Sequence, residues 1–169
     1  MTLSMHQVAI PPVIHSLGNL VHILRVAAEH ATSRTIDEQI LLNSRLFPDM
    51  FPLIRQVQIA SDIARRGMCR LAGIEPASVE DNETSFQELI ARLEATIDGL
   101  RGVGEHQLEG SESLPIELPV RGETLHFDGR TFLLYFILPN LYFHVTTTYD
   151  ILRHNGVELG KRDFLGDPR

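Results

Sequence analysis

Four long segments of this chain repeat apolar side chains every three or four residues, and this spacing restricts the fold more than any other feature. Side chains three or four positions apart lie on one face of a helix, so each segment predicts an amphipathic helix. Such a helix must bury its apolar face against a neighbour. The four segments therefore predict an all-α bundle.

Capping residues, prolines and glycines indicate where these helices begin and end. The four expected helices are one that follows Ser4, one from Pro48 or Asp49 to Ala72 before Gly73, one from Ser85 to about Gly102, and one from after Arg130 to Gly156. A short helical piece is expected over residues 36–43. Proline lacks the backbone N–H that continues a helix, so Pro11 and Pro12 are expected to kink or restart the first helix, and Pro139 to bend the last.

Two stretches between the predicted helices have a different composition. Residues 75–83 are rich in acidic side chains and are predicted to form a loop. Residues 115–127 alternate apolar and polar side chains around a turn of Arg121, Gly122 and Glu123, which predicts a small β-hairpin inserted before the last helix. Pro119 cannot donate a hydrogen bond to a neighbouring strand, so it limits the hairpin to an edge or a brief pairing.

Composition indicates which classes of protein are excluded. The 169 residues with 43% hydrophobic content suit one domain spanning residues 1–169. The formal charge is −7 and no stretch concentrates Lys and Arg, which argues against nucleic-acid binding. Cys69 is the single cysteine, so neither an intrachain disulfide nor a thiolate metal cluster can form. No apolar run is long enough to span a membrane, and we expect a cytoplasmic protein.

The last predicted helix carries polar side chains where its apolar stripe should be unbroken. Asn140, His144, Thr147 and Thr148 lie within about a quarter turn of the aliphatic residues of that stripe. A buried imidazole or amide costs several kcal/mol unless another group pairs with it. These residues therefore predict an internal hydrogen-bond network, a bound ligand or a metal site.

Three runs of sequence resemble a known family. They are LPNLYFHVTTTYDILRHNG at residues 138–156, LGKRDFLG at residues 159–166 and RLFPDMFPL at residues 45–53. Together they closely resemble an uncharacterised family of the DinB/YfiT-like superfamily, and the similarity extends over nearly the whole chain. The resemblance implies a DinB/YfiT-like four-helix bundle with a long crossover between the second and third helices, commonly assembled as a homodimer.

The wider superfamily also implies a particular metal site. Some members resemble thiol transferases or thiol-dependent isomerases, with one histidine on the second helix and a His-x-x-x-His pair on the fourth as ligands. On that pattern, His144 occupies the second position of the pair, Asn140 the first, and Gln56 lies near the second-helix position. Zinc and nickel prefer imidazole to an amide oxygen. We therefore expect no three-histidine site, and His144 as the ligand if any metal binds.

Two functions remain open. In the first, a metal-free bundle uses Gln56, Asn140, His144 and Thr148 either to bind a small polar ligand or as a purely structural network. In the second, His144 is a ligand of Ni, Zn or Mn, or a general base assisted by Asp49 or Gln56, in an enzyme that transfers or isomerises a small thiol-linked substrate. Asp49 is included because it approaches the inner face of the second predicted helix, although an acid in a first turn more often stabilises the helix end.

Other polar residues have simpler interpretations. His15 and His22 are seven residues apart, but they lie about 150° from the apolar centre of the first helix, so we expect them to face solvent or a dimer partner. Residues 161–163, Lys-Arg-Asp, can bind an anion at a pocket mouth or form a salt-bridged strap across the end of the bundle. The strap is the favoured interpretation.

Overall fold

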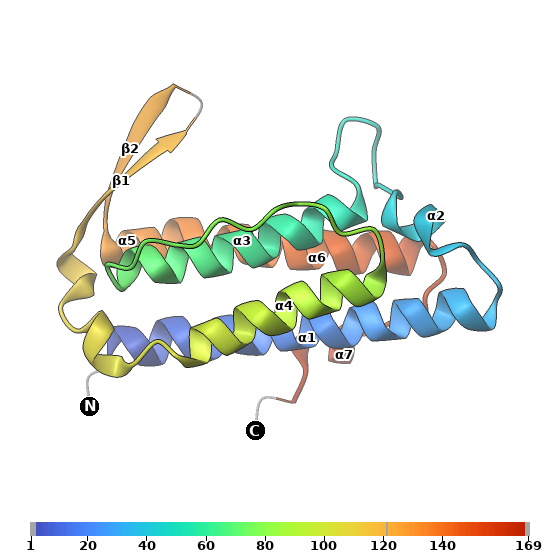
Figure 1. Ribbon diagram of the computed structural model, residues 1–169, viewed down its shortest axis with the longest axis horizontal. Coiled ribbons are helices and arrows are strands. Elements are labelled where there is room, and N and C mark those ends of the chain that lie inside the picture. Colours follow the sequence, from blue (N-terminus) through green and yellow to red (C-terminus); the bar gives the residue numbers. More distant parts are fainter. Residues whose placement is uncertain (1–2, 121, 168–169) are drawn as a thin grey trace.

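The computed structural model describes residues 3–120 and 122–167, and most of them are helical (Figure 1). The long helices are α1 (Met5–Ser33), α3 (Leu53–Leu71), α4 (Phe86–Arg101) and α6 (Leu138–His154). The shorter ones are α2 (Glu38–Leu42), α5 (Gly129–Phe132) and α7 (Lys161–Leu165), with 3-10 turns at Glu105–Leu108 and Ser111–Ser113 and a π-helical turn at Leu133–Ile137. No helix within the described ranges is both long and apolar enough to cross a membrane.

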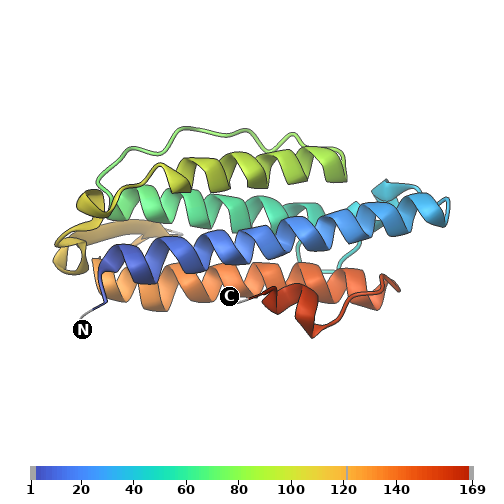
Figure 2. The same cartoon turned by 90° about the horizontal axis from the view of Figure 1, so that it is seen from below.

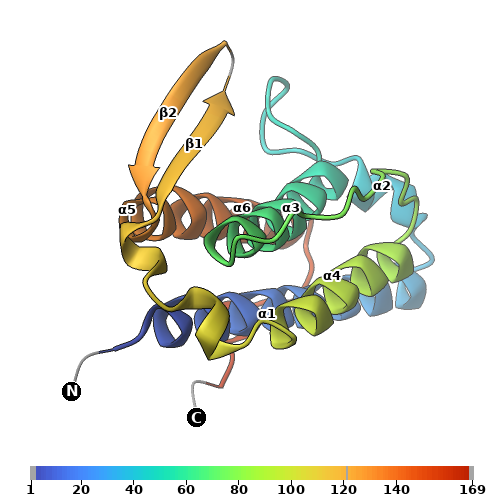
Figure 3. The same cartoon turned by 60° about the vertical axis from the view of Figure 1, so that its left-hand side comes forward.

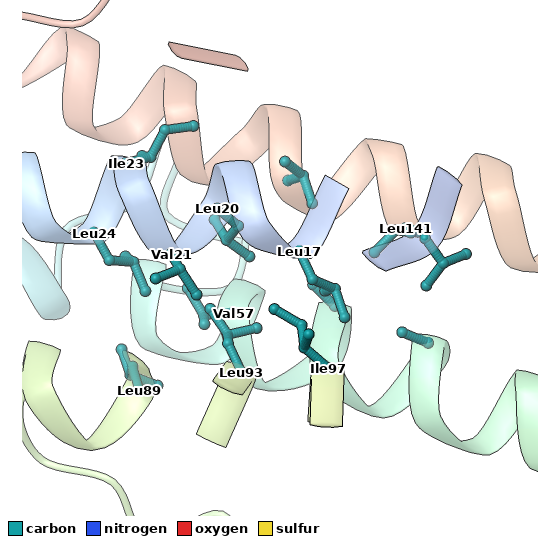
Figure 4. Close-up of a cluster of buried hydrophobic side chains, with 14 of the residues drawn as sticks. Leu17, Leu20, Val21, Ile23, Leu24, Val57, Leu89, Leu93, Ile97 and Leu141 are labelled. Atoms are coloured by element: carbon teal, nitrogen blue, oxygen red, sulfur yellow. The ribbon is translucent and has the colours of Figure 1, made fainter. Parts of the chain in front are cut away.

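The long helices pack in two layers around one hydrophobic core. α1 lies beside α4, and α3 lies beside α6 (Figure 3). Figure 4 shows buried aliphatic side chains from all four helices, among them Leu17, Leu20, Leu24, Val57, Leu93 and Leu141. Each such side chain contributes about 1.5–3 kcal/mol when it is removed from water. Burial of the four apolar faces is therefore the main source of stability.

A long crossover connects α3 to α4. Residues 72–85 run back along the length of α3, so that α3 and α4 point in the same direction (Figure 1). Gly73 has a φ of +66°, which glycine adopts readily, and it follows the end of α3 as predicted. Ser85 caps α4 by accepting the N–H of Glu88, whereas the Glu88 carboxylate accepts the N–H of Thr84. The predicted start of this helix at Ser85 is correct, and the Glu88 carboxylate binds the backbone of the residue before it.

α1 is continuous from its capped end. The Ser4 hydroxyl accepts the N–H of Gln7, and the Gln7 side chain accepts the N–H of Ser4. The helix then passes through Pro11 and Pro12, so the expected restart is wrong. Only two backbone donors are lost there, and Val13 and its apolar neighbours are buried in the core, so packing keeps the segment helical.

α3 begins later than the sequence predicted. Its first residue is Leu53, and Pro52 precedes it as the N-cap, so the expected start at Pro48 or Asp49 is wrong. A proline disfavours the helical conformation in the residue before it, so Phe51 cannot continue a helix into Pro52. Asp49 therefore lies in an exposed loop outside α3.

The predicted hairpin is present before the last helices. Strands β1 (Pro115–Val120) and β2 (Glu123–Asp128) pair antiparallel and stand away from the helical layers beside α5 (Figure 3). Pro119 lies opposite Thr124. A two-stranded sheet leaves each strand a free edge, which a proline tolerates. Arg121, predicted to lie in the turn, is outside the described residues.

The last predicted helix forms in three consecutive parts. α5 is capped by Asp128, whose carboxylate accepts the N–H of Thr131 at 2.7 Å. The π-helical turn follows, in which the N–H of Leu138 donates to the carbonyl of Leu133, five residues back. Pro139, the second residue of the regular helix α6, lies in its first turn, where the missing N–H is tolerated. The π-helical turn lies just before Pro139. The proline lacks the N–H that would bond to the carbonyl four residues back, so the regular helical hydrogen bonding is interrupted there.

The C-terminal segment packs against α1, as Figure 2 shows for α7. His22 Nε2 lies 2.7 Å from the Asp163 carboxylate, and His15 Nε2 lies 2.7 Å from the main-chain carbonyl of Leu165. Both rings remain exposed, as expected, but their hydrogen bonds to this segment were not predicted. Asp163 thus ties a strap to the side of α1, while residues 161–162 are exposed.

Candidate functional site

The polar stripe of α6 meets α3 at one buried hydrogen bond. His144 Nδ1 lies 2.7 Å from Gln56 Oε1, although the two residues are far apart in the sequence. Gln56 is 2% exposed and His144 is 9% exposed. The amide nitrogen of Gln56 donates to the main-chain carbonyl of Phe51 at 3.0 Å, in the loop before α3. This chain of contacts joins the loop, α3 and α6.

The hydrogen bonds of Gln56 determine which nitrogen of His144 carries the proton. A carbonyl only accepts, so the Phe51 carbonyl requires the NH₂ group of Gln56 to face it. Gln56 Oε1 therefore faces His144 and accepts a hydrogen bond from Nδ1–H. The Nε2 atom of His144 is left with its lone pair, and no group among the described residues donates to it.

The surroundings of His144 favour the neutral ring. Burial lowers its pKa below the ordinary value, because the charged imidazolium loses hydration, and the positive charge of Arg55 lowers the pKa further. The ring of Phe143 meets the imidazole edge-on, with centroids 5.2 Å apart, and Phe143 itself is 56% exposed. At neutral pH the site thus presents an uncharged hydrogen-bond acceptor near the protein surface.

The other predicted site residues do not join this pair. Asn140 is half-buried, and its amide donates to the carbonyl of Phe136 at 2.6 Å. Thr147 and Thr148 are buried, and each hydroxyl donates to the carbonyl four residues back in α6. Asp49 lies in the exposed loop before α3. The predicted stripe is therefore satisfied mostly within its own helix, and only His144 reaches across to α3.

Comparison with known proteins agrees with this fold. The model of a domain of unknown function, DUF1993, matches residues 5–165. The chain belongs to the DUF1993 family. A solved structure of a DinB family member protein from Shewanella denitrificans is 40% identical, with a TM-score of 0.90, and the match covers 98% of this chain and 94% of that chain. No curated protein matches this sequence. The DUF1993 chain is thus a member of an uncharacterised DinB-like family.

The donor atoms of this DUF1993 chain do not fit a three-histidine metal site. At the three positions that the resemblance assigns to metal ligands, this chain carries Gln56, Asn140 and His144, which are two amides and one imidazole. The Gln56 oxygen already accepts from His144. Within residues 3–120 and 122–167, no group of three or more His, Cys, Asp or Glu side chains is placed to hold an ion. Zinc and nickel favour nitrogen and sulfur donors, so this set is a poor site for either.

Sequence analysis missed a second buried polar cluster, where α3 faces α4. Arg92 of α4 has a side chain only 4% exposed, and its guanidinium lies 3.0 Å from Asp62, 2.9 Å from Asp81 and 2.9 Å from Glu83. Burial alone would lower the pKa of Arg92, but Glu83 and the other carboxylates raise it, so the group stays charged. The sequence did carry a signal for this cluster. Arg92 interrupts the apolar stripe of α4, and the acidic loop 75–83 precedes that helix.

Proposed function

We propose that this DUF1993 protein is a DinB/YfiT-type four-helix bundle without the superfamily's three-histidine metal site, and that it binds a small polar ligand between α3 and α6. One observation carries the proposal. Gln56 holds His144 in the Nδ1–H form, while Nε2 keeps a lone pair that no described group uses. The ligand donates an N–H or O–H to that atom.

The arrangement suits binding for two reasons. The imidazole is oriented before any ligand arrives, because it is bonded to Gln56, and the Phe51 carbonyl holds the Gln56 amide in place. The entropy cost of ordering this side chain at binding is therefore small. The low dielectric around a nearly buried ring also strengthens a hydrogen bond made there. Phe143, edge-on to the imidazole and largely exposed, offers apolar contact for the rest of a small ligand.

A matched pair of small amides tests this proposal. 2-Pyrrolidinone has an N–H donor, and N-methyl-2-pyrrolidinone has nearly the same shape without one. We expect 2-pyrrolidinone to shift the ¹⁵N resonance of His144 Nε2 in NMR titrations, and the N-methyl compound to shift it far less. The variant His144→Gln lacks this resonance and therefore identifies it in the spectrum. Equal effects of the two compounds, or none, would assign the Gln56–His144 pair a purely structural role.

The alternative is a divalent-metal enzyme of the thiol transferase or isomerase type. A specific observation favours testing it: a neutral imidazole with a free Nε2 is also what a metal ligand or general base requires. Elemental analysis of the untagged protein after addition of Mn, Ni and Zn, beside His144→Ala, separates the two functions. Stoichiometric metal that is lost in the variant would replace the proposed function with the enzymatic one.

The homodimer and the cytoplasmic location expected from the sequence stay predictions. Exposed aromatic side chains of the π-helical turn and of α6 support the dimer, because Tyr135 is 75%, Tyr142 41% and Phe143 56% exposed. Aromatic residues are enriched at protein interfaces relative to the rest of the surface. We infer that the π-helical turn and the adjoining part of α6 face a second copy.

A further inference from the structure

A separate cleft of about 330 Å³ lies between α3, strand β1 and the π-helical turn. α3 contributes Ile59, Ile63 and several charged residues, and β1 contributes Leu118 and Pro119. The volume falls at the lower end of the range for small-molecule sites, about 300–1,000 Å³. Neither residue of the Gln56–His144 pair lines this cleft, so its properties can be argued independently of the proposed function.

The polar part of the cleft carries an excess of positive charge. Arg55, Arg66 and Arg70 of α3 line it, together with a single carboxylate, Asp62. This is unexpected on a chain whose formal charge is −7. Cations gathered at one concave site raise the local concentration of anions.

Arg55 is paired with Asp81, which does not line the cleft, and Asp62 does not neutralise the other two arginines. Its carboxylate is shared by Arg65 at 2.9 Å, Arg66 at 3.2 Å and Arg92 at 3.0 Å. Arg70 donates to a main-chain carbonyl of β1 at 3.1 Å and, within the described part of the chain, has no carboxylate partner. Arg70 and, in part, Arg66 therefore retain N–H donors and charge for an anion.

The remaining lining is apolar and partly flat. The rings of Phe132 and Phe136 stack with centroids 5.4 Å apart and planes 12° apart. Both line the cleft, as do Ile63, Ile137 and Leu118. Such a surface suits a planar apolar group, because stacking adds to the area removed from water.

The local backbone maintains this shape. The π-helical turn includes Phe136 and Ile137, and π-helical turns are frequent at functional sites. Gly67 of α3 allows Ile137 to approach closely, because a Cβ at that position would lie 2.7 Å from Ile137 Cδ1. The contact between α3 and the turn thus depends on a glycine, as close approach of two elements often does.

We propose that this cleft binds an organic anion with a flat apolar body, of the aromatic carboxylate class. The carboxylate binds the guanidinium groups of Arg70 and Arg66, whose planar donors match its two oxygens. The body lies against Phe136 and Leu118. This ligand class goes beyond the function proposed for the Gln56–His144 pair, and the two sites share no residue.

Calorimetric titration with 2-naphthoate and with its neutral amide, 2-naphthamide, tests the proposal. We expect 2-naphthoate to bind more tightly than the amide, and Arg70→Gln to weaken naphthoate about tenfold without changing the amide. Arg70→Lys keeps the charge, so its affinity for 2-naphthoate should lie between those of the unmodified protein and of Arg70→Gln. Arg101→Gln, at an exposed position of α4 away from the cleft, should leave both affinities unchanged.

Amide binding serves as the check that the cleft is intact. Arg70 also donates to a carbonyl of β1, so one outcome of Arg70→Gln is a disturbed hairpin and weaker binding of both compounds. In that event Arg66→Gln decides, because Arg66 makes no hydrogen bond to the described residues of the hairpin. A loss confined to naphthoate supports the proposal, and an equal loss of both overturns it. Equal affinity of the two compounds in the unmodified protein, or no binding of either at millimolar concentration, also overturns it.

Discussion

α3 meets its two neighbours through two different kinds of buried polar contact. Toward α6, Gln56 and His144 share one neutral hydrogen bond. Toward α4, beside a hydrogen bond between the Ser61 and Thr96 hydroxyls, Asp62 joins two carboxylates of the crossover around the guanidinium of Arg92. Charged groups lose far more hydration on burial than neutral ones, so the guanidinium needs several partners where the imidazole needs one. The charged cluster is therefore committed to structure, whereas the neutral pair leaves an acceptor free.

The largest expected effect comes from breaking the charged side. Arg92→Met would leave Asp62, Asp81 and Glu83 close together without their shared cation. Removal of one partner from a buried ion cluster costs about 3–5 kcal/mol. We expect a loss of that size in the free energy of unfolding measured with urea at pH 7, and faster hydrogen exchange in residues 74–85.

The matched control lies on the same helix. Arg101 pairs with Asp98 at 2.8 Å, but its side chain is 65% exposed. Exposed pairs contribute less than about 1 kcal/mol, so Arg101→Met should change the free energy of unfolding by no more than that. A similar loss in both variants would mean that the Arg92 cluster does not anchor the crossover.

A smaller effect is expected on the neutral side. His144→Leu leaves the Gln56 oxygen buried without a donor, and Gln56→Leu leaves His144 Nδ1–H without an acceptor. Each variant should lose about 1–3 kcal/mol of unfolding free energy. The double variant should lose clearly less than the sum, since neither polar group remains unpaired. Additive losses in urea denaturation would show that the two side chains do not act as a pair.

The smallest expected effect is a difference in pH dependence. The His144 side and the Asp81 side of α3 lose stability in different pH ranges. The folded pKa of His144 is lowered, first by burial and then by Arg55. The unfolded chain therefore takes up that proton more readily, so stability is complete above about pH 6.5 and falls as the pH drops from there toward the folded pKa. Partial burial would raise the pKa of Asp81, but hydrogen bonds and charge from Arg55 and Arg92 outweigh it and lower the pKa.

Asp81 thus weakens the fold only below about pH 4, after the His144 contribution has begun to decline. The measurement is the unfolding free energy between pH 8 and 5 for the unmodified protein and for the double leucine variant. Their difference should shrink as the pH falls below 6.5. A difference that stays constant over this range would contradict a lowered His144 pKa.

Local patterns predicted those parts of the fold that depend on neighbours in sequence. The caps at Ser4 and Ser85, the glycine after α3 and the alternating hairpin were correct, because each rests on contacts a few residues apart. The start of α3 was wrong because the apolar spacing extended past Pro52, where the proline restricts the backbone. The contacts of the C-terminal strap with α1 were not predicted, because they join His15 and His22 to residues at the other end of the chain.

The sequence by itself determined that α6 buries polar residues, since helical periodicity alone orients His144 and Thr148 inward. Only the tertiary structure decided that the threonines bond within their helix while His144 meets Gln56. It also decided which nitrogen of His144 carries the proton, because the Phe51 carbonyl in the loop before α3 orients the amide of Gln56. A buried donor takes whichever acceptor the packing of two helices brings within about 3 Å, and that distance depends on the whole core rather than on the spacing of residues along one helix.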